Sequence, residues 1–183
     1  CLPSRKSFVN FAKNHTDLES VDHIYSKAIS FFDGNISESL FCLMFTMIPY
    51  NKIMMKLPLT GITVSIPLPS PPQKIFNEKK RNTPKKIFFD SPNTNSGDKD
   101  KLAHFFGNAF LHYNVSFFNL SKFLGIFVEY FEQGFFIQGG YDNRDLIANH
   151  LGDLFAIMLK TKPSAKPSEA LIIYQLLYFR ICP

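Results

Sequence analysis

The chain has 183 residues, 45% of them hydrophobic, with 21 phenylalanines and no tryptophan. This length and composition predict a folded chain with one domain, or one domain with an appendage, and exclude a largely disordered protein. The net charge of +5 is small, and no RNA-binding motif is present, so we expect no nucleic-acid partner. The three cysteines, at positions 1, 42 and 182, form no CxxC motif, which argues against a disulfide scaffold or a thiolate metal site.

Residues 1–15 are polar and are predicted to form a tether. The sequence begins at Cys1, and a mature bacterial lipoprotein begins on a cysteine that carries lipid once its signal peptide has been removed. We therefore expect lipidation at Cys1; the alternative is that the sequence simply starts at this residue. No apolar run reaches the roughly 18 to 20 residues that span a bilayer, so we expect this lipid to hold the chain at the membrane.

Two helices are predicted in the N-terminal half. Thr16 and Glu19 have the spacing of a capping box, which predicts a first helix over residues 16–32. Asn35 and Glu38 repeat the spacing before SLFCLMFTM, an almost wholly apolar segment that predicts a second, buried helix.

An extended arm and a basic segment follow these helices. Residues 57–72, LPLTGITVSIPLPSPP, place β-branched residues between prolines and are predicted to form a short strand or extended arm. Residues 73–86 contain six Lys and Arg residues and are expected to form a solvated loop, with contact to acidic lipid headgroups as the alternative. The segment SPNTNSG, residues 91–97, has the composition of a linker, so we place the main boundary there.

Four helices are predicted after the boundary, over roughly 98–113, 119–135, 143–160 and 168–181. We therefore predict a mainly α protein, a helical bundle of about five to six helices with a short strand or extended arm in the N-terminal half. The predicted organisation is a tether (1–15), an N-terminal helical region with the extended arm and basic loop (16–97), and a helical domain (98–183).

Three of these helices carry short polar and small residues opposite their apolar stripes. Glycine inside an exposed helix costs on the order of 1 kcal/mol relative to alanine, so Gly107 and Gly152 on such faces indicate close packing. We infer that the polar faces pack together and enclose a polar cluster. Its predicted members are Asp100, His104, Glu129, Asp145 and Asn149.

The same spacings resemble a known family. The motifs are D-K-x-x-H-F at Asp100–Phe105, G-x-x-x-E at Gly125–Glu129 and D-L-x-A-N-x-x-G at Asp145–Gly152. Together they are similar to small bacterial lipoproteins of the YfiM type and to the related pattern of VanZ-like envelope proteins, over about residues 98–160. Val128 departs from the YfiM pattern, which has a lysine before the glutamate. The resemblance implies an envelope location and no established activity.

The cluster leaves chemical alternatives open. His104, Glu129 and Asp145 could bind a divalent ion. However, the motif HExxH is absent, and a site with a single histidine binds zinc poorly, so we expect no metal or cofactor. His104 and Glu129 could act as general acid and base, but no G-x-S-x-G elbow accompanies them.

We therefore predict a bacterial cell-envelope lipoprotein, lipid-anchored in the periplasm at the outer membrane through Cys1. It would act as a structural or protein-interaction module with an envelope protein partner and without catalysis. The alternative is an envelope hydrolase or metal-dependent enzyme that acts on lipid or peptidoglycan through His104 and Glu129.

Overall fold

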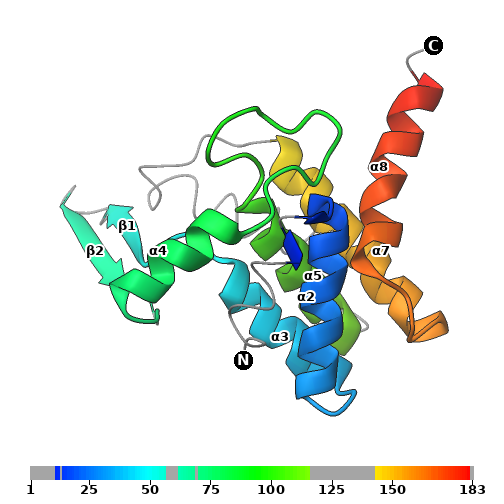
Figure 1. The fold of residues 1–183 in the computed structure, drawn as a ribbon, viewed down its shortest axis with the longest axis horizontal. Helices are drawn as coiled ribbons and strands as arrows, with labels where there is room; N and C mark the ends of the chain where they lie inside the picture. Colours follow the sequence, from blue (N-terminus) through cyan, green and yellow to red (C-terminus); the bar gives the residue numbers. More distant parts are fainter. Residues whose placement is uncertain (1–10, 13, 57–61, 69, 116–142, 182–183) are drawn as a thin grey trace.

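The computed structural model describes residues 11–12, 14–56, 62–68, 70–115 and 143–181 (Figure 1). The elements in these ranges are α2 (Asp17–Phe31), α3 (Ile36–Met47), β1 (Lys52–Lys56), β2 (Thr63–Pro67), α4 (Gln73–Asn82), α5 (Lys101–Asn114), α7 (Asn143–Thr161) and α8 (Pro167–Ile181).

The prediction of a mainly helical bundle is confirmed. Helices α5 and α7 pack along each other, α3 packs against α5, and α8 packs against α7 and α2. Phe105, Phe106 and Phe155 are fully buried at the centre. The core includes residues from both sides of the predicted boundary at 97, so helices from the two halves of the chain share it. No helix in the described ranges is both long enough and apolar enough to cross a bilayer.

The first two described helices begin where the sequence predicts. The backbone N–H of Glu19 donates to the Thr16 hydroxyl at 3.2 Å, and the Glu19 carboxylate accepts from the Thr16 N–H at 2.8 Å. At α3, the Asn35 side chain accepts from the Glu38 N–H at 3.1 Å. These bonds satisfy backbone donors that the first turn of a helix leaves without partners.

The predicted arm contains β2, and its antiparallel partner β1 was not predicted. Lys52 pairs with Pro67 and Lys56 with Thr63, which makes a two-stranded hairpin. The segment KIMMK lacks the strict alternation of a half-buried strand, so its pattern gave little signal. The hairpin and α4 lie together at one side of the bundle (Figure 1).

The expectation of a solvated loop over 73–86 is wrong for its first ten residues, which form α4. Helix-favouring Gln, Lys, Glu and Arg follow Pro72, whose fixed backbone suits a helix start. One side of α4 is held to the bundle: Phe76 is buried, and the Lys79 ammonium donates to the Ile48 carbonyl at 2.8 Å. A helix with a single buried ring has a low mean hydropathy, which explains why it resembled a loop.

The predicted linker, residues 91–97, is attached to its surroundings. The backbone N–H of Asp98 donates to the Lys85 carbonyl at 2.8 Å, directly after Gly97. Gly97 has a φ of +53°, and a Cβ atom there would lie 2.4 Å from the Lys85 oxygen. Only glycine fits this position without strain.

Candidate functional site

Helices α5 and α7 approach each other closely at Gly152. A Cβ atom at this position would lie 2.3 Å from the Phe105 carbonyl oxygen, well inside the roughly 3.3 Å of an ordinary C···O contact. The predicted close approach is confirmed at Gly152. Gly107 faces α3 instead, where a Cβ atom would meet the Met44 sulfur at 3.3 Å.

Lys101, in the first turn of α5, is the centre of a charged cluster between these helices. Its Nζ lies 3.0 Å from Oδ2 of Asp100 and 2.7 Å from Oδ1 of Asp145, and its side chain is 6% exposed. Removing an ammonium group from water costs several kcal/mol, so it must be compensated by nearby charge. The two carboxylates supply this compensation, and Asp145 thereby links the start of α7 to the start of α5.

His104 lies at the open edge of the cluster. Its Nε2 is 3.3 Å from Oδ1 of Asp145, and its side chain is 42% exposed. The prediction that the packed faces enclose His104 is therefore wrong. The reason is that the Lys101 ammonium, and not the imidazole, occupies the buried position beside Asp145.

Tyr50 lies close enough to these charges for them to change the pKa of its phenol. Burial raises the pKa of the Tyr50 phenol, Asp100 raises it further, Lys101 opposes the rise, and Asp145 adds to it. A tyrosine phenol is protonated at neutral pH even without this shift, and it can donate a hydrogen bond. No sequence pattern marks Tyr50, because it follows a helix-ending proline in a segment without periodicity.

Asn108 and Asn149 form the buried part of the polar contact, further along both helices. The Asn108 amide donates to the Asn149 side-chain carbonyl and, at 3.0 Å, to the backbone carbonyl of His104. Both side chains are buried. A buried amide pair of this kind fixes the register of two helices, because sliding either helix would leave the amides without partners.

A second charged cluster, which the sequence analysis missed, joins the start of α7 to the loop before α5. Nη2 of Arg144 lies 2.6 Å from both carboxylate oxygens of Asp98, which is 1% exposed, and Nη1 donates to the Asp90 carbonyl at 2.8 Å. Burial raises the pKa of Asp98, while the Ser91 hydroxyl and the Arg144 guanidinium act in the opposite direction. No sequence spacing marks this contact, because its partners are brought together by the loop.

The five predicted cluster residues have different positions in the structure. Asp100, His104 and Asp145 meet around Lys101. Asn149 is buried with Asn108, away from these charges. Glu129 lies outside the described residues, as do Gly125 and Cys1. Among the residues that are described, no group of three or more His, Cys, Asp or Glu side chains could hold a metal ion.

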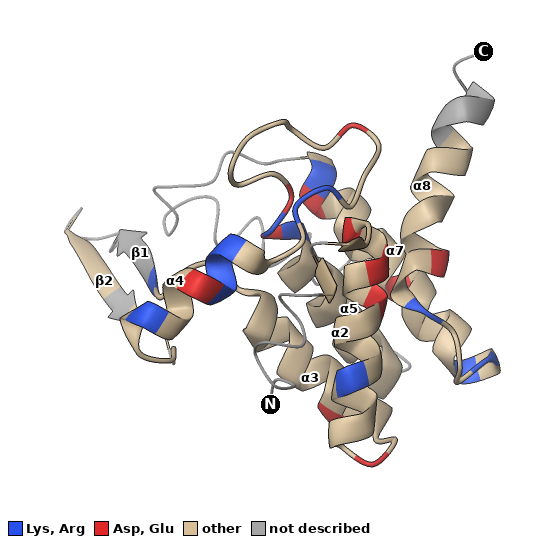
Figure 2. Cartoon of the chain, viewed as in Figure 1, with Lys and Arg blue, Asp and Glu red and all other residues tan. Residues whose placement is uncertain are grey.

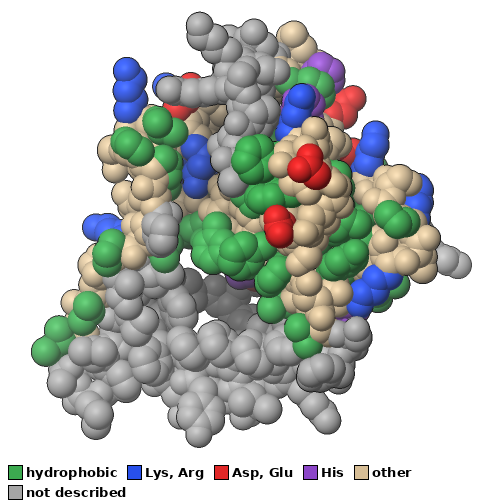
Figure 3. Space-filling model, turned by 90° about the horizontal axis from the view of Figure 1, so that it is seen from below, with side chains coloured by type: hydrophobic (Ala, Val, Ile, Leu, Met, Phe, Trp, Pro, Cys, Tyr) green, Lys and Arg blue, Asp and Glu red, His purple; other side chains and the backbone are tan. Residues whose placement is uncertain are grey.

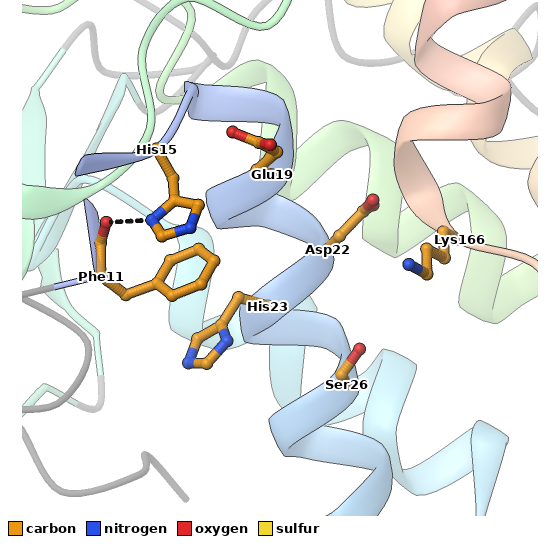
Figure 4. Close-up of a pocket in the computed structure, with 7 residues that line it drawn as sticks. All are labelled: Phe11, His15, Glu19, Asp22, His23, Ser26 and Lys166. Atoms are coloured by element: carbon orange, nitrogen blue, oxygen red, sulfur yellow. Dashed lines mark hydrogen bonds between the residues drawn. The ribbon is translucent and has the colours of Figure 1, made fainter. Parts of the chain in front are cut away.

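Two cavities in the described part of the chain are lined by residues other than His104. The larger, about 240 Å³, lies beside α2, where the Phe11 ring stacks on His15 and His23 at centroid distances of 3.7 and 4.1 Å (Figure 4). The smaller, about 20 Å³, lies between the end of α3 and α4. Residues lining the larger cavity are Phe11, His15, Glu19, Asp22, His23, Ser26 and Lys166.

Comparisons with protein-family models, with curated proteins and with solved structures found no match to this chain.

Proposed function

We propose that this chain is a non-catalytic interaction module of the bacterial cell envelope. Its charged cluster holds α5 and α7 together, and an exposed aromatic surface on α3 binds a protein partner. The envelope location is supported by the motifs at Asp100–Phe105 and Asp145–Gly152, which resemble those of YfiM-type lipoproteins.

The observation that carries the proposal is the burial of Lys101 between two carboxylates. An enzyme that uses carboxylates as acid or base needs them free to exchange protons with a substrate. Here Asp100 and Asp145 both contact an ammonium group that has almost no access to water. Their charges are used to stabilise a contact between helices, which is what a structural cluster requires.

The surface for a partner is formed by rings on α3. Phe41 and Phe45 are 46% and 48% exposed, and their rings meet edge to face with centroids 5.1 Å apart. Phe41 also packs on Phe110 of α5, again at 5.1 Å, so the exposed rings are held in place before a partner binds. Figure 3 shows hydrophobic side chains gathered on the underside of the bundle. Rigid, exposed aromatic rings are typical of the residues that dominate binding energy in protein interfaces.

A photo-reactive amino acid at position 45 tests the proposal in living cells. We expect one predominant covalent adduct with an envelope protein, and its loss when Phe41→Ser is added. The control places the same amino acid at Lys162, whose side chain is 59% exposed on the turn between α7 and α8. Equal adducts from both positions, or none from position 45, would contradict the proposed surface.

A second candidate function is an envelope hydrolase acting through His104 and Glu129. The exposure of His104 and its contact with Asp145 favour it, since a carboxylate beside an accessible imidazole can orient a general base. The test is His104→Gln, assayed on envelope lipids and peptidoglycan fragments alongside the melting temperature. Turnover that disappears at an unchanged melting temperature would support the hydrolase, whereas no turnover by the unmodified protein would exclude it for these substrates.

Lipidation of Cys1 stays a prediction, which mass spectrometry of the N-terminal peptide from native membranes can check.

A further inference from the structure

The charge of the chain is concentrated in one region. Residues 52–86 contain eight of the twenty Lys and Arg residues but only one of the fifteen Asp and Glu residues. The rest of the sequence carries more acidic than basic residues, so the net charge of +5 conceals two regions of opposite sign. In Figure 2, Lys and Arg recur along α4, while most Asp and Glu positions lie on the bundle and its loops. We call β1, β2 and α4, with Lys85 and Lys86, the basic appendage.

Helix α4 presents two of its four basic residues, Lys74 and Arg81, away from the bundle. Phe76 faces inward, and Lys74 and Arg81, seven residues apart on the opposite side, are both exposed. Lys80 is exposed as well, but it lies one helical turn beyond Phe76 and not on the outward side. The inward face is fixed by the bond from Lys79 to the Ile48 carbonyl, so the outward face has a defined orientation.

The basic side chains also crowd one another. Burial lowers the pKa of Lys99, in the loop before α5, and the charges of Lys85 and Lys80 lower it further, with Asp17 acting in the opposite direction. An anionic partner at Lys80 and Lys85 would reduce this repulsion.

Exposed apolar side chains lie in the same appendage. Ile62 and Val64, two residues apart and therefore on one face of the hairpin, are 58% and 39% exposed. Ile75 on α4 is 41% exposed, directly beside Lys74. Exposed cationic and aliphatic side chains in one appendage match the boundary between lipid headgroups and acyl chains.

We propose that the basic appendage docks on the surface of an anionic lipid bilayer, with Lys74 and Arg81 at the headgroups and Ile62 and Val64 inserted between them. The inference is independent of the aromatic surface on α3 and of any lipid on Cys1. A bilayer fits better than a nucleic acid, because binding of single strands uses exposed rings for stacking. The only aromatic residue between positions 52 and 86 is Phe76, which is buried.

Sedimentation of the full 183-residue chain with vesicles tests the proposal. The vesicles contain phosphatidylcholine alone or with about 30% phosphatidylglycerol, a content at which each nearby Lys or Arg should improve partitioning about five-fold. We expect binding to the anionic vesicles only, weakened by added salt. The variant Lys74→Glu/Arg81→Glu should bind at least ~20-fold more weakly, which is the loss of two such contributions.

Two further variants make the outcome decisive. Lys27→Glu/Lys166→Glu changes the net charge equally at exposed positions of the bundle and should bind like the unmodified chain. Ile62→Ser/Val64→Ser should abolish whatever binding persists in about 0.5 M salt, where headgroup attraction is screened. Equal binding to neutral vesicles, or an equal loss in the bundle variant, would overturn the proposal. The proposal would also be overturned if the chain bound a DNA duplex and not the vesicles, and if Lys74→Glu/Arg81→Glu lost this binding to DNA. Circular dichroism shows whether Lys74→Glu/Arg81→Glu is folded. If it is not, Lys74→Gln/Arg81→Gln is used in its place.

Discussion

Replacement of Gly152 by alanine tests the contact between α5 and α7 with two opposite expectations. If this face of α7 were solvated, alanine would stabilise the helix by about 1 kcal/mol through its higher helix propensity. In the structure, however, the added methyl group would lie 2.3 Å from the Phe105 carbonyl oxygen and 3.2 Å from the Ala109 nitrogen. The sign of the change in stability therefore distinguishes the two situations.

The magnitude follows from what must move. An ordinary C···O contact is about 3.3 Å, so the helices must separate by about 1 Å at Gly152. Overpacking of a core costs roughly 1 to 3 kcal/mol. The upper value applies because the obstacle is a backbone carbonyl rather than the end of a flexible side chain. After subtraction of the gain of about 1 kcal/mol in propensity, the expected net loss is about 2 kcal/mol.

The assay is thermal and urea unfolding of the full chain, with Gly107→Ala as the matched control. A loss of 2 kcal/mol corresponds to a decrease of roughly 4 to 8 °C in Tm for a chain of this size. At Gly107 the new methyl group meets only the flexible Met44 side chain, at 3.3 Å, so the net change should lie within about 0.5 kcal/mol of zero. A higher Tm for Gly152→Ala would refute the close approach and the argument built on it.

Two other substitutions test the charged cluster and the start of α2. Lys101→Met leaves Asp100 and Asp145 facing each other without a cation, and urea unfolding should show a loss of about 2 kcal/mol. This is less than for a fully buried pair, because both carboxylates can reach water; Lys27→Met, at an exposed position, should change little. Glu19→Gln tests pH dependence: hydrogen bonds from the Thr16 backbone and side chain lower the pKa of Glu19 below its ordinary 4.5. Its carboxylate thus stabilises the fold above pH 4.5, and the Tm advantage over Glu19→Gln should shrink as the pH falls through the lowered pKa. A difference in Tm that stays constant from about pH 6 to pH 3 would contradict this linkage.

Local signals in the sequence predicted much of the helical architecture. The capping pairs at Thr16 and Asn35 mark helix starts because each is complete within four residues. Gly152 could also be interpreted correctly, since an interior glycine has a cost that only a close neighbour explains. These features depend on short-range chemistry, which the sequence contains directly.

Features that depend on tertiary placement were not predicted. Lys101 belongs to the recognised motif, but its burial was not predicted, because it depends on where Asp145 lies. Helix α4 was missed because one ring, Phe76, supplies its buried contact. His104 was expected inside the cluster, and only the position of Lys101 explains its exposure.

The attachment of residues 91–98 has a practical consequence for protein engineering. Their polar, glycine-containing sequence would suggest a good place to insert an epitope tag or a protease cleavage site. Yet Asp98 is bound to Arg144, and Gly97 has no room for a side chain, so an insertion there would displace the start of α7. The turn at Asp33 and Gly34 is the better choice, because both residues are exposed and a Cβ atom at Gly34 would meet no atom within 4 Å.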